Sequence, residues 1–181
     1  MGRALLDFED KATGAAVALV YFAGHGIEVN GVNYLVPADA VLAKASSIAY
    51  DTISLPSVMA SVDHAQMRIV LLDACRNNPF PMVAANGARA ISRGLARVDE
   101  KQVPRSTVIV FAAKDGATAE DGSGKNSPFA AALLAHLKDP KLEINMLIRR
   151  VTDQVETSTG GAQEPFVYAN LTSAEVYLGR H

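Results

Sequence analysis

The sequence predicts a single α/β domain whose mostly parallel central sheet is covered by helices on both faces. Three apolar runs, residues 16–22, 67–72 and 107–113, lack the alternation of half-exposed strands, which favours strands buried on both faces. Segments with helical spacing separate or follow these runs, and strands that alternate with helices are typical of a parallel sheet. The length of 181 residues fits one domain over the whole chain.

The predicted helices come in chain order after the strands. Residues 55–65 begin at a leucine–proline step and place apolar residues on one side. Ser127 and Pro128 are typical of an N-cap and a first helical position, and a further helix is expected over residues 143–155. The expected core-facing residues are Val58, Met59 and Val62, then Phe129, Leu133, Leu134 and Leu137, then Ile144, Leu147, Ile148, Val151 and Val155. Two short strands are expected to close the domain, over residues 166–169 and 175–178.

Two segments are predicted to be loops on one rim of the sheet. Residues 78–105 have little periodicity and carry basic positions, so we expect a long surface loop of the kind that serves as a lid, binding loop or processing site. Its basic residues are Arg89, Arg93, Arg97 and Lys101. The glycine-rich residues 114–126 follow the third apolar run.

Composition limits the classes of partner. The net charge of −2 gives no positive field that would attract nucleic acid or an anionic membrane. The apolar runs are shorter than the ~20 residues of a membrane span, and the N-terminal segment carries acids where a signal peptide would be apolar. No glycine-rich phosphate loop supports a nucleotide-binding domain. We therefore expect a soluble, cytoplasmic protein without nucleic-acid or membrane partners.

A lone cysteine and a glycine-flanked histidine are the candidate reactive groups. A single cysteine forms neither an intramolecular disulfide nor a cysteine-based zinc site, which leaves a buried core thiol or a reactive one. Active sites in parallel sheets lie beyond the carboxyl ends of strands. The first apolar run continues into GHG, with His25 at its centre, and the second into DAC, with Cys75 at its end. We expect both residues at strand ends, on neighbouring strands.

This pair matches the needs of a thiol protease, which requires a thiolate, a base and donors to the oxyanion. Cys75 would be the nucleophile, and His25 would take its proton and return it to the leaving amine. The backbone N–H groups of Gly26 and Cys75 are the expected oxyanion donors, because glycine lets a substrate approach the backbone closely. The alternatives are a turn histidine and a core thiol. The chemistry needs no metal and no cofactor.

The motifs YFAGHG and LLDACRN together resemble the paired histidine and cysteine motifs of the caspase-like peptidases (peptidase C14 type), which include caspases, metacaspases and paracaspases. Their known signature places the histidine about 50 residues before the cysteine, and here the two are 50 positions apart. GIEVNGVNYLVPADA, RGLARV, FAAKDGATAEDG, NSPFAAALL and QEPFVYANL are similar to the bacterial branch. The resemblance implies a cysteine endopeptidase with a caspase-like three-layer αβα sandwich. Its large-subunit-like part would span about 1–80 and its small-subunit-like part about 106–181.

The residue two positions before the cysteine bears on specificity. Caspases, which cut after aspartate, carry glutamine there, whereas metacaspases and paracaspases, which cut after arginine or lysine, carry aspartate. This chain has Asp73. The resemblance therefore implies a peptide or protein substrate with Arg or Lys at P1 and Asp73 at the pocket floor, where a carboxylate would pair with the cation. An alternative role for Asp73 is to orient the active site. Asp115 and Asp121 are further candidates for the pocket, with a solvated turn as the alternative.

Two departures from the family pattern qualify the resemblance. RNN follows the cysteine instead of the His-Ser-Gly run of metacaspases, so paracaspase-like and other bacterial members are nearer. The family fold starts with a strand, a helix and a strand, but only about a dozen residues precede the histidine strand here. We expect these elements to be lacking and one edge of that strand to be open to a second copy or another partner. The alternative function is a catalytically impaired scaffold or fragment that binds a partner through this edge.

Overall fold

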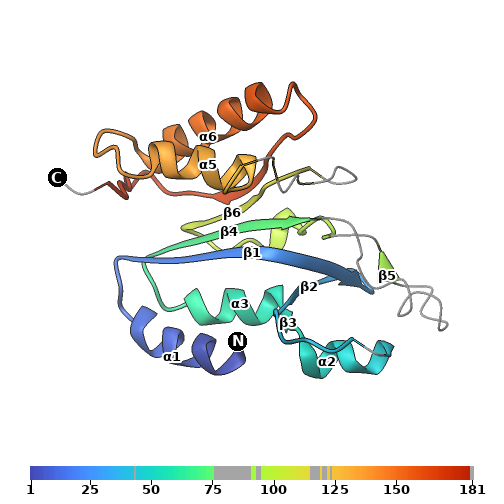
Figure 1. The fold of residues 1–181 in the computed structure, drawn as a ribbon. Coiled ribbons are helices and arrows are strands. Elements are labelled where there is room, and N and C mark those ends of the chain that lie inside the picture. The colour runs from blue at the N-terminus through green and yellow to red at the C-terminus, as the bar shows by residue number, and fades with distance from the viewer. Residues whose placement is uncertain are drawn as a thin grey trace.

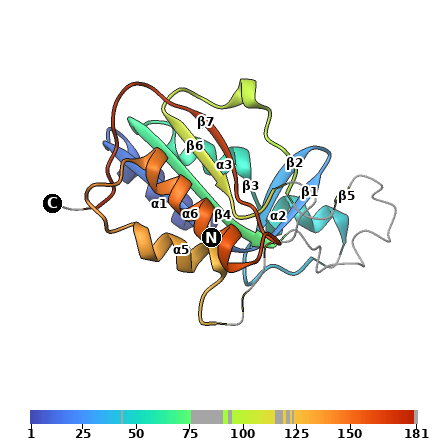
Figure 2. The same ribbon diagram turned by 90° about the horizontal axis from the view of Figure 1, so that it is seen from above.

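A computed structural model describes residues 1–42, 44–75, 91–92, 95–114, 119, 122 and 124–179. Within these ranges the chain forms one seven-stranded sheet in the order β3-β2-β1-β4-β6-β7, with β5 also paired to β1. Helices α5 and α6 lie on one face and α1 and α3 on the other, which gives three layers (Figure 1). Figure 2 looks down on α5 and α6 where they lie over the strands. The predicted αβα fold class is confirmed.

The strands are β1 Val17–Val29, β2 Val32–Val36, β3 Ile53–Ser54, β4 Met67–Cys75, β5 Ile91–Ser92, β6 Thr107–Phe111 and β7 Phe166–Asn170. The α-helices are α1 Gly2–Ala12, α2 Ile48–Asp51, α3 Leu55–Val62, α5 Pro128–His136 and α6 Ile144–Ser158. Two short 3-10 helices span Ala45–Ser47 and Glu100–Gln102. No helix in the described part of the chain combines the length and apolar character that crossing a membrane requires.

The three predicted apolar runs form the parallel centre of the sheet. β4 pairs in parallel with β1 on one side and with β6 on the other, while β2, β3, β5 and β7 pair antiparallel around them. A parallel pair needs a crossover, and α3 lies in the connection between β1 and β4. The sequence did not predict β2, which turns back from β1 through Asn30 and Gly31. Both residues have positive φ (52° and 80°), as a tight two-residue hairpin requires.

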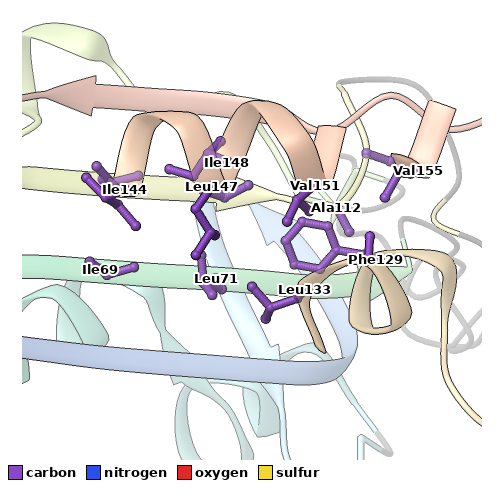
Figure 3. Packing of buried hydrophobic residues seen from close by; sticks show 14 of the residues in the cluster. Ile69, Leu71, Ala112, Phe129, Leu133, Ile144, Leu147, Ile148, Val151 and Val155 are labelled. Atoms are coloured by element: carbon purple, nitrogen blue, oxygen red, sulfur yellow. The ribbon is translucent and has the colours of Figure 1, made fainter. Parts of the chain in front are cut away.

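The core on the α5/α6 face follows the predicted helical periodicity. All five expected residues of α6 are buried against β4 and β6, together with Phe129 and Leu133 of α5 (Figure 3). Ser127 caps α5 as predicted, because its Oγ accepts a hydrogen bond from the Ala130 amide at 2.9 Å. The prediction for Leu134 is wrong, since its side chain is 57% exposed. One position beyond Leu133 turns a residue about 100° around the helix, away from the sheet and α6.

The opposite core contains a helix that the sequence did not predict. Leu5, Phe8 and Ala12 of α1 recur at helical spacing and pack with α3 under the sheet. The acidic residues of this segment occupy its other faces. The segment is therefore an amphipathic helix, which its acidic composition alone does not indicate. Residues before the histidine strand therefore contribute a helix to the αβα sandwich, while no described strand precedes β1.

Three other expectations differ from the structure. The described part of residues 78–105 includes β5 and two buried side chains, Leu95 and Val103, and is therefore not only a surface loop. Residues 175–178 are not a strand; Tyr177 alone pairs, in an isolated bridge with Glu143. The first apolar run is not buried on both faces, because Tyr21 is 40% exposed. On the side away from β4, β1 pairs with β2 only from His25 onward, so residues 17–24 have no strand partner there within the described chain.

Candidate active site

The two candidate catalytic residues lie side by side in the sheet. His25 of β1 and Cys75 of β4 are register partners in the parallel pairing of these strands. Adjacent strands are about 4.8 Å apart in the hydrogen-bonding direction, so the two backbones are immediate neighbours. The prediction that the residues belong to neighbouring strands is confirmed. The prediction that both residues lie at strand ends is correct for Cys75, the last residue of β4, and wrong for His25, because β1 continues to Val29 in its hairpin with β2.

Alternation along β1 defines the face on which the histidine lies. Val17 and Leu19 pack into the α5/α6 core, while Val20 and Phe22 pack into the α1/α3 core. Side chains two residues apart share a face of a strand. Tyr21 and His25 therefore follow Val17 and Leu19 on the α5/α6 face, and the His25 side chain is exposed to solvent. A base that exchanges protons with a substrate needs such access.

Gly26 has a packing role that the sequence did not predict. A Cβ atom at Gly26 would lie 2.5 Å from Cδ2 of Leu95, a distance that real Cβ contacts do not show. Leu95 is buried in the α1/α3 core and covers this point of β1 from beneath. The absence of a side chain at Gly26 is thus required for the packing of Leu95, independently of any hydrogen bond from the Gly26 amide to a substrate. Its assignment as an oxyanion donor stays a prediction.

A buried asparagine fastens the segment that contains Leu95. The Asn33 side chain of β2 donates from Nδ2 to the Ala96 carbonyl at 2.9 Å and accepts from the Ala96 amide at 2.5 Å. The two bonds satisfy both polar groups of Ala96 in the manner of a strand pairing. Sequence reasoning missed this contact, because a single asparagine in the segment GVNYLV gives no signal of its partner. The result is that residues 95–96 are held against the β1–β2 hairpin beside His25.

Asp73 is a buried carboxylate at the same end of the sheet. It lies two residues before Cys75 on β4 and is only 7% exposed. Its Oδ2 accepts a hydrogen bond from the Tyr21 hydroxyl at 2.8 Å and another from the Ser127 hydroxyl at 2.5 Å. Sequence reasoning assigned no role to Tyr21 and assigned Ser127 only its cap. Three elements therefore meet at Asp73, namely β1, β4 and the start of α5.

The charges around Asp73 are unbalanced within the described residues. The described ion pairs are Arg68 with Asp63 and Lys114 with Glu164, and neither includes Asp73. Burial raises the pKa of Tyr21, and the hydrogen bond to Asp73 and its negative charge raise the pKa further. Tyr21 therefore remains a neutral donor at physiological pH. Asp73 is held by hydroxyl groups without a cation among its described neighbours.

Asp115 and Asp121, the further pocket candidates, lie outside the described residues, as do Arg89 and Arg93 of the basic loop. Before residue 115 the described chain ends at Lys114, whose amide donates to the Glu164 carbonyl at 2.8 Å. Within the described ranges, no three His, Cys, Asp or Glu side chains gather as metal ligands.

Comparison with known proteins adds a finding that covers almost the whole chain. A family model described as the caspase domain, Peptidase_C14, matches residues 1–177. The match includes α1 as well as both motifs and the strands that hold His25 and Cys75. No curated protein sequence matches the chain.

Proposed function

The chain belongs to the caspase-domain family of cysteine peptidases, and we propose that it is an endopeptidase with Cys75 as nucleophile and His25 as base. The observation that carries this proposal is the register pairing of His25 with Cys75 on adjacent parallel strands. A nucleophile and its base must come within hydrogen-bond reach during the reaction, and neighbouring strands bring their backbones close enough for that. The proposal includes the cytoplasmic location that the sequence predicts.

The proposed reaction proceeds in two acyl-transfer steps. His25 takes the thiol proton of Cys75, and the thiolate attacks the carbonyl carbon of the scissile peptide bond. The backbone N–H groups of Cys75 and Gly26 stabilise the negative charge that develops on the carbonyl oxygen. His25 then donates the proton to the leaving amine as the C–N bond breaks. Water, deprotonated by His25, hydrolyses the thioester, and the thiol is regenerated.

Hydrolysis of fluorogenic peptides tests the catalytic pair. We expect Cys75→Ala and His25→Ala each to reduce kcat/KM by at least about a thousandfold, because the two residues act as a unit. His64→Ala is the matched control, since His64 is an exposed histidine at the other end of the sheet, in the turn before β4. Its activity should equal that of the unmodified chain. A folded protein without Cys75-dependent cleavage of Arg, Lys or Asp peptides would contradict the proposal.

We propose further that the P1 residue is Arg or Lys and that Asp73 binds it. Burial of a carboxylate without a counter-charge is costly, and no described side chain supplies a cation to Asp73. A basic substrate side chain would supply the missing charge through a charge-assisted hydrogen bond. Asp115 and Asp121 remain further candidates for the same pocket.

A panel of peptides that differ only at P1 tests this specificity. The panel contains Arg, Lys, Asp and citrulline, which has the shape of arginine without its charge. We expect Asp73→Asn to reduce the preference for Arg over citrulline by about ten- to a hundredfold, the usual range for a hydrogen bond to a charged group. Asp63→Asn is the control, because Asp63 is an exposed carboxylate paired with Arg68. Preferred cleavage after Asp would overturn this part of the proposal.

The unpaired edge of β1 favours a second candidate function, that of a scaffold. Residues 17–24 have no strand partner on the side away from β4 within the described chain, and Leu19, Val20 and Phe22 on this edge are only partly buried. An extended segment of a second copy or of another protein could add there as a further strand. Hydrogen exchange at increasing concentrations of the Cys75→Ala protein tests self-pairing. Concentration-dependent protection of the amides of residues 17–24 would support it, and unchanged exchange would contradict it.

A further inference from the structure

We infer that Tyr21 and Ser127 are positioning residues that decide which oxygen of Asp73 meets the P1 side chain. This inference rests on the proposed basic P1 specificity and adds the two hydroxyls that shape the pocket. Both hydroxyls donate to the same oxygen, Oδ2. Within the described residues, no hydrogen bond reaches Oδ1 of Asp73. The substrate cation would therefore meet Oδ1.

The occupied oxygen limits how arginine can bind. A carboxylate oxygen has two lone pairs, and Tyr21 and Ser127 together use both lone pairs of Oδ2. A guanidinium binds a carboxylate best through two parallel N–H bonds to both oxygens. Asp73 offers only Oδ1 for this purpose, so an arginine makes a single-point contact that a lysine ammonium can match. Asp73 should therefore discriminate weakly between Arg and Lys.

The two donors are themselves held in place from different elements. The Ser127 Oγ accepts the Ala130 amide at 2.9 Å while it donates to Asp73, so the cap of α5 fixes the direction of its proton. Tyr21 comes from β1 and reaches Asp73 across the β1–β4 pairing. A tyrosine has few rotatable bonds, which reduces the entropy lost in holding its hydroxyl there. The arrangement of Asp73 is thus built into the sheet and helix before any substrate arrives.

Removal of either hydroxyl should raise selectivity for arginine. In Tyr21→Phe and in Ser127→Ala, one lone pair of Oδ2 becomes available, and a guanidinium can then use both oxygens. We expect the ratio of kcat/KM for P1-Arg to P1-Lys peptides to increase about fivefold in each variant, the equivalent of one added charge-assisted bond after desolvation. Ser127→Thr keeps the hydroxyl, so this variant should have the same Arg to Lys ratio of kcat/KM as the unmodified chain.

Matched controls separate this effect from general destabilisation. Tyr177→Phe removes a tyrosine hydroxyl that donates to Glu175 at 2.9 Å, and Tyr177 lies beside Met67 at the start of β4, at the opposite end of that strand from Asp73. Ser54→Ala removes an N-cap of the same kind from α3, where Ser54 accepts the Ser57 amide at 3.2 Å. Both controls should leave the Arg to Lys ratio within about twofold of the original. If Tyr21→Phe and Ser127→Ala lower cleavage of both peptides equally, their role is only structural and the inference is overturned.

A binding measurement keeps this result separate from the proposed catalysis. Calorimetry on the Cys75→Ala chain measures Kd for peptide amides that end in Arg, Lys or citrulline. If the unmodified chain hydrolyses no peptide, the catalytic proposal fails, but the Arg to Lys ratio of Kd values still tests Tyr21 and Ser127. We expect Tyr21→Phe and Ser127→Ala, each added to the Cys75→Ala chain, to change the Arg to Lys ratio of Kd values about fivefold in favour of Arg, which is about 1 kcal/mol. Equal binding of Arg and citrulline peptides, or an unchanged ratio in both variants, would overturn the inference.

Discussion

The two strands that carry the candidate catalytic pair are held very differently. β4 pairs with β1 and β6, and its described side chains from Ile69 to Ala74 are all buried. β1 pairs with β4 along residues 17–25, but β2 covers its other edge only from His25 to Val29. The core therefore fixes the strand of Cys75 over its length. The strand of His25 is paired with β4 over the same length but gains a partner on its other edge only at its functional end, where the β1–β2 hairpin begins.

Register partners give the sharpest test of this comparison and the largest expected effect on stability. Val20 of β1 pairs with Val70 of β4, and both pack into the α1/α3 core. Val70 is fully buried, whereas Val20 is partly exposed. We expect Val70→Ala to lower the free energy of unfolding by about 2–3 kcal/mol and Val20→Ala by about 1 kcal/mol, since less area and a smaller cavity are involved. Urea unfolding measures both. Equal losses would show that the edge of β1 is buried in solution.

The functional end of β1 is tightly packed, so adding a methyl group there should destabilise the chain, whereas removing methyl groups destabilises the middle of the strand. In Gly26→Ala the new methyl would lie 2.5 Å from Cδ2 of Leu95, so the variant is overpacked. We expect a loss of about 1–3 kcal/mol in the free energy of unfolding. Gly124→Ala is the control, because no atom lies within 4 Å of a Cβ placed there. Gly26→Ala should cost less in a Leu95→Ala background than in the unmodified chain, because the free energies of contacting residues are not additive. A Gly26→Ala protein as stable as Gly124→Ala would contradict the packing role of Leu95.

The comparison also shows which features sequence alone could predict. Continuous apolar runs and i, i+3, i+4 spacing identified β4, β6 and α6, because the burial of a strand or of one helix face produces a recognisable pattern of apolar residues in the local sequence. The fold class and the adjacency of His25 and Cys75 followed from these runs and the rule for parallel sheets. Leu134 was misplaced because periodicity gives the centre of a buried stripe more reliably than its border.

The missed features depend on contacts between distant residues. Tyr21 and Ser127 lie 52 and 54 positions from Asp73, and nothing in their local sequence indicates a shared partner. Leu95 occupies the space beside Gly26 only because β2 and Asn33 hold the segment that follows β5. Such contacts arise from the tertiary fold, so they become visible only when the sheet is assembled.

The hydrogen bond between Tyr21 and Asp73 links the two strands and gives the smallest predicted effect. Burial of the ring and the neighbouring Asp73 carboxylate raise the pKa of Tyr21 in the folded chain above its ordinary value of 10.0. A raised pKa contributes stability that is fully present below pH 10 and is lost as pH rises, because the unfolded chain ionises first. The gap in unfolding free energy between the unmodified chain and Tyr21→Phe should be about 1 kcal/mol or less, since the ring is 40% exposed.

This gap should stay constant from neutral pH to about pH 9 and shrink above about pH 10, where tyrosine ionises. Urea unfolding of both proteins across this range measures it. Tyr177→Phe is the control, because the Tyr177 hydroxyl bonds Glu175 on the surface and should give a smaller gap at every pH. A gap for Tyr21→Phe that is flat or grows above pH 10 would show that this hydroxyl does not join β1 to Asp73. The strand of His25 would then be ordered on the α5/α6 face by its pairing with β4, by the packing of Val17 and Leu19 and by the β2 hairpin, without a side-chain bond to Asp73.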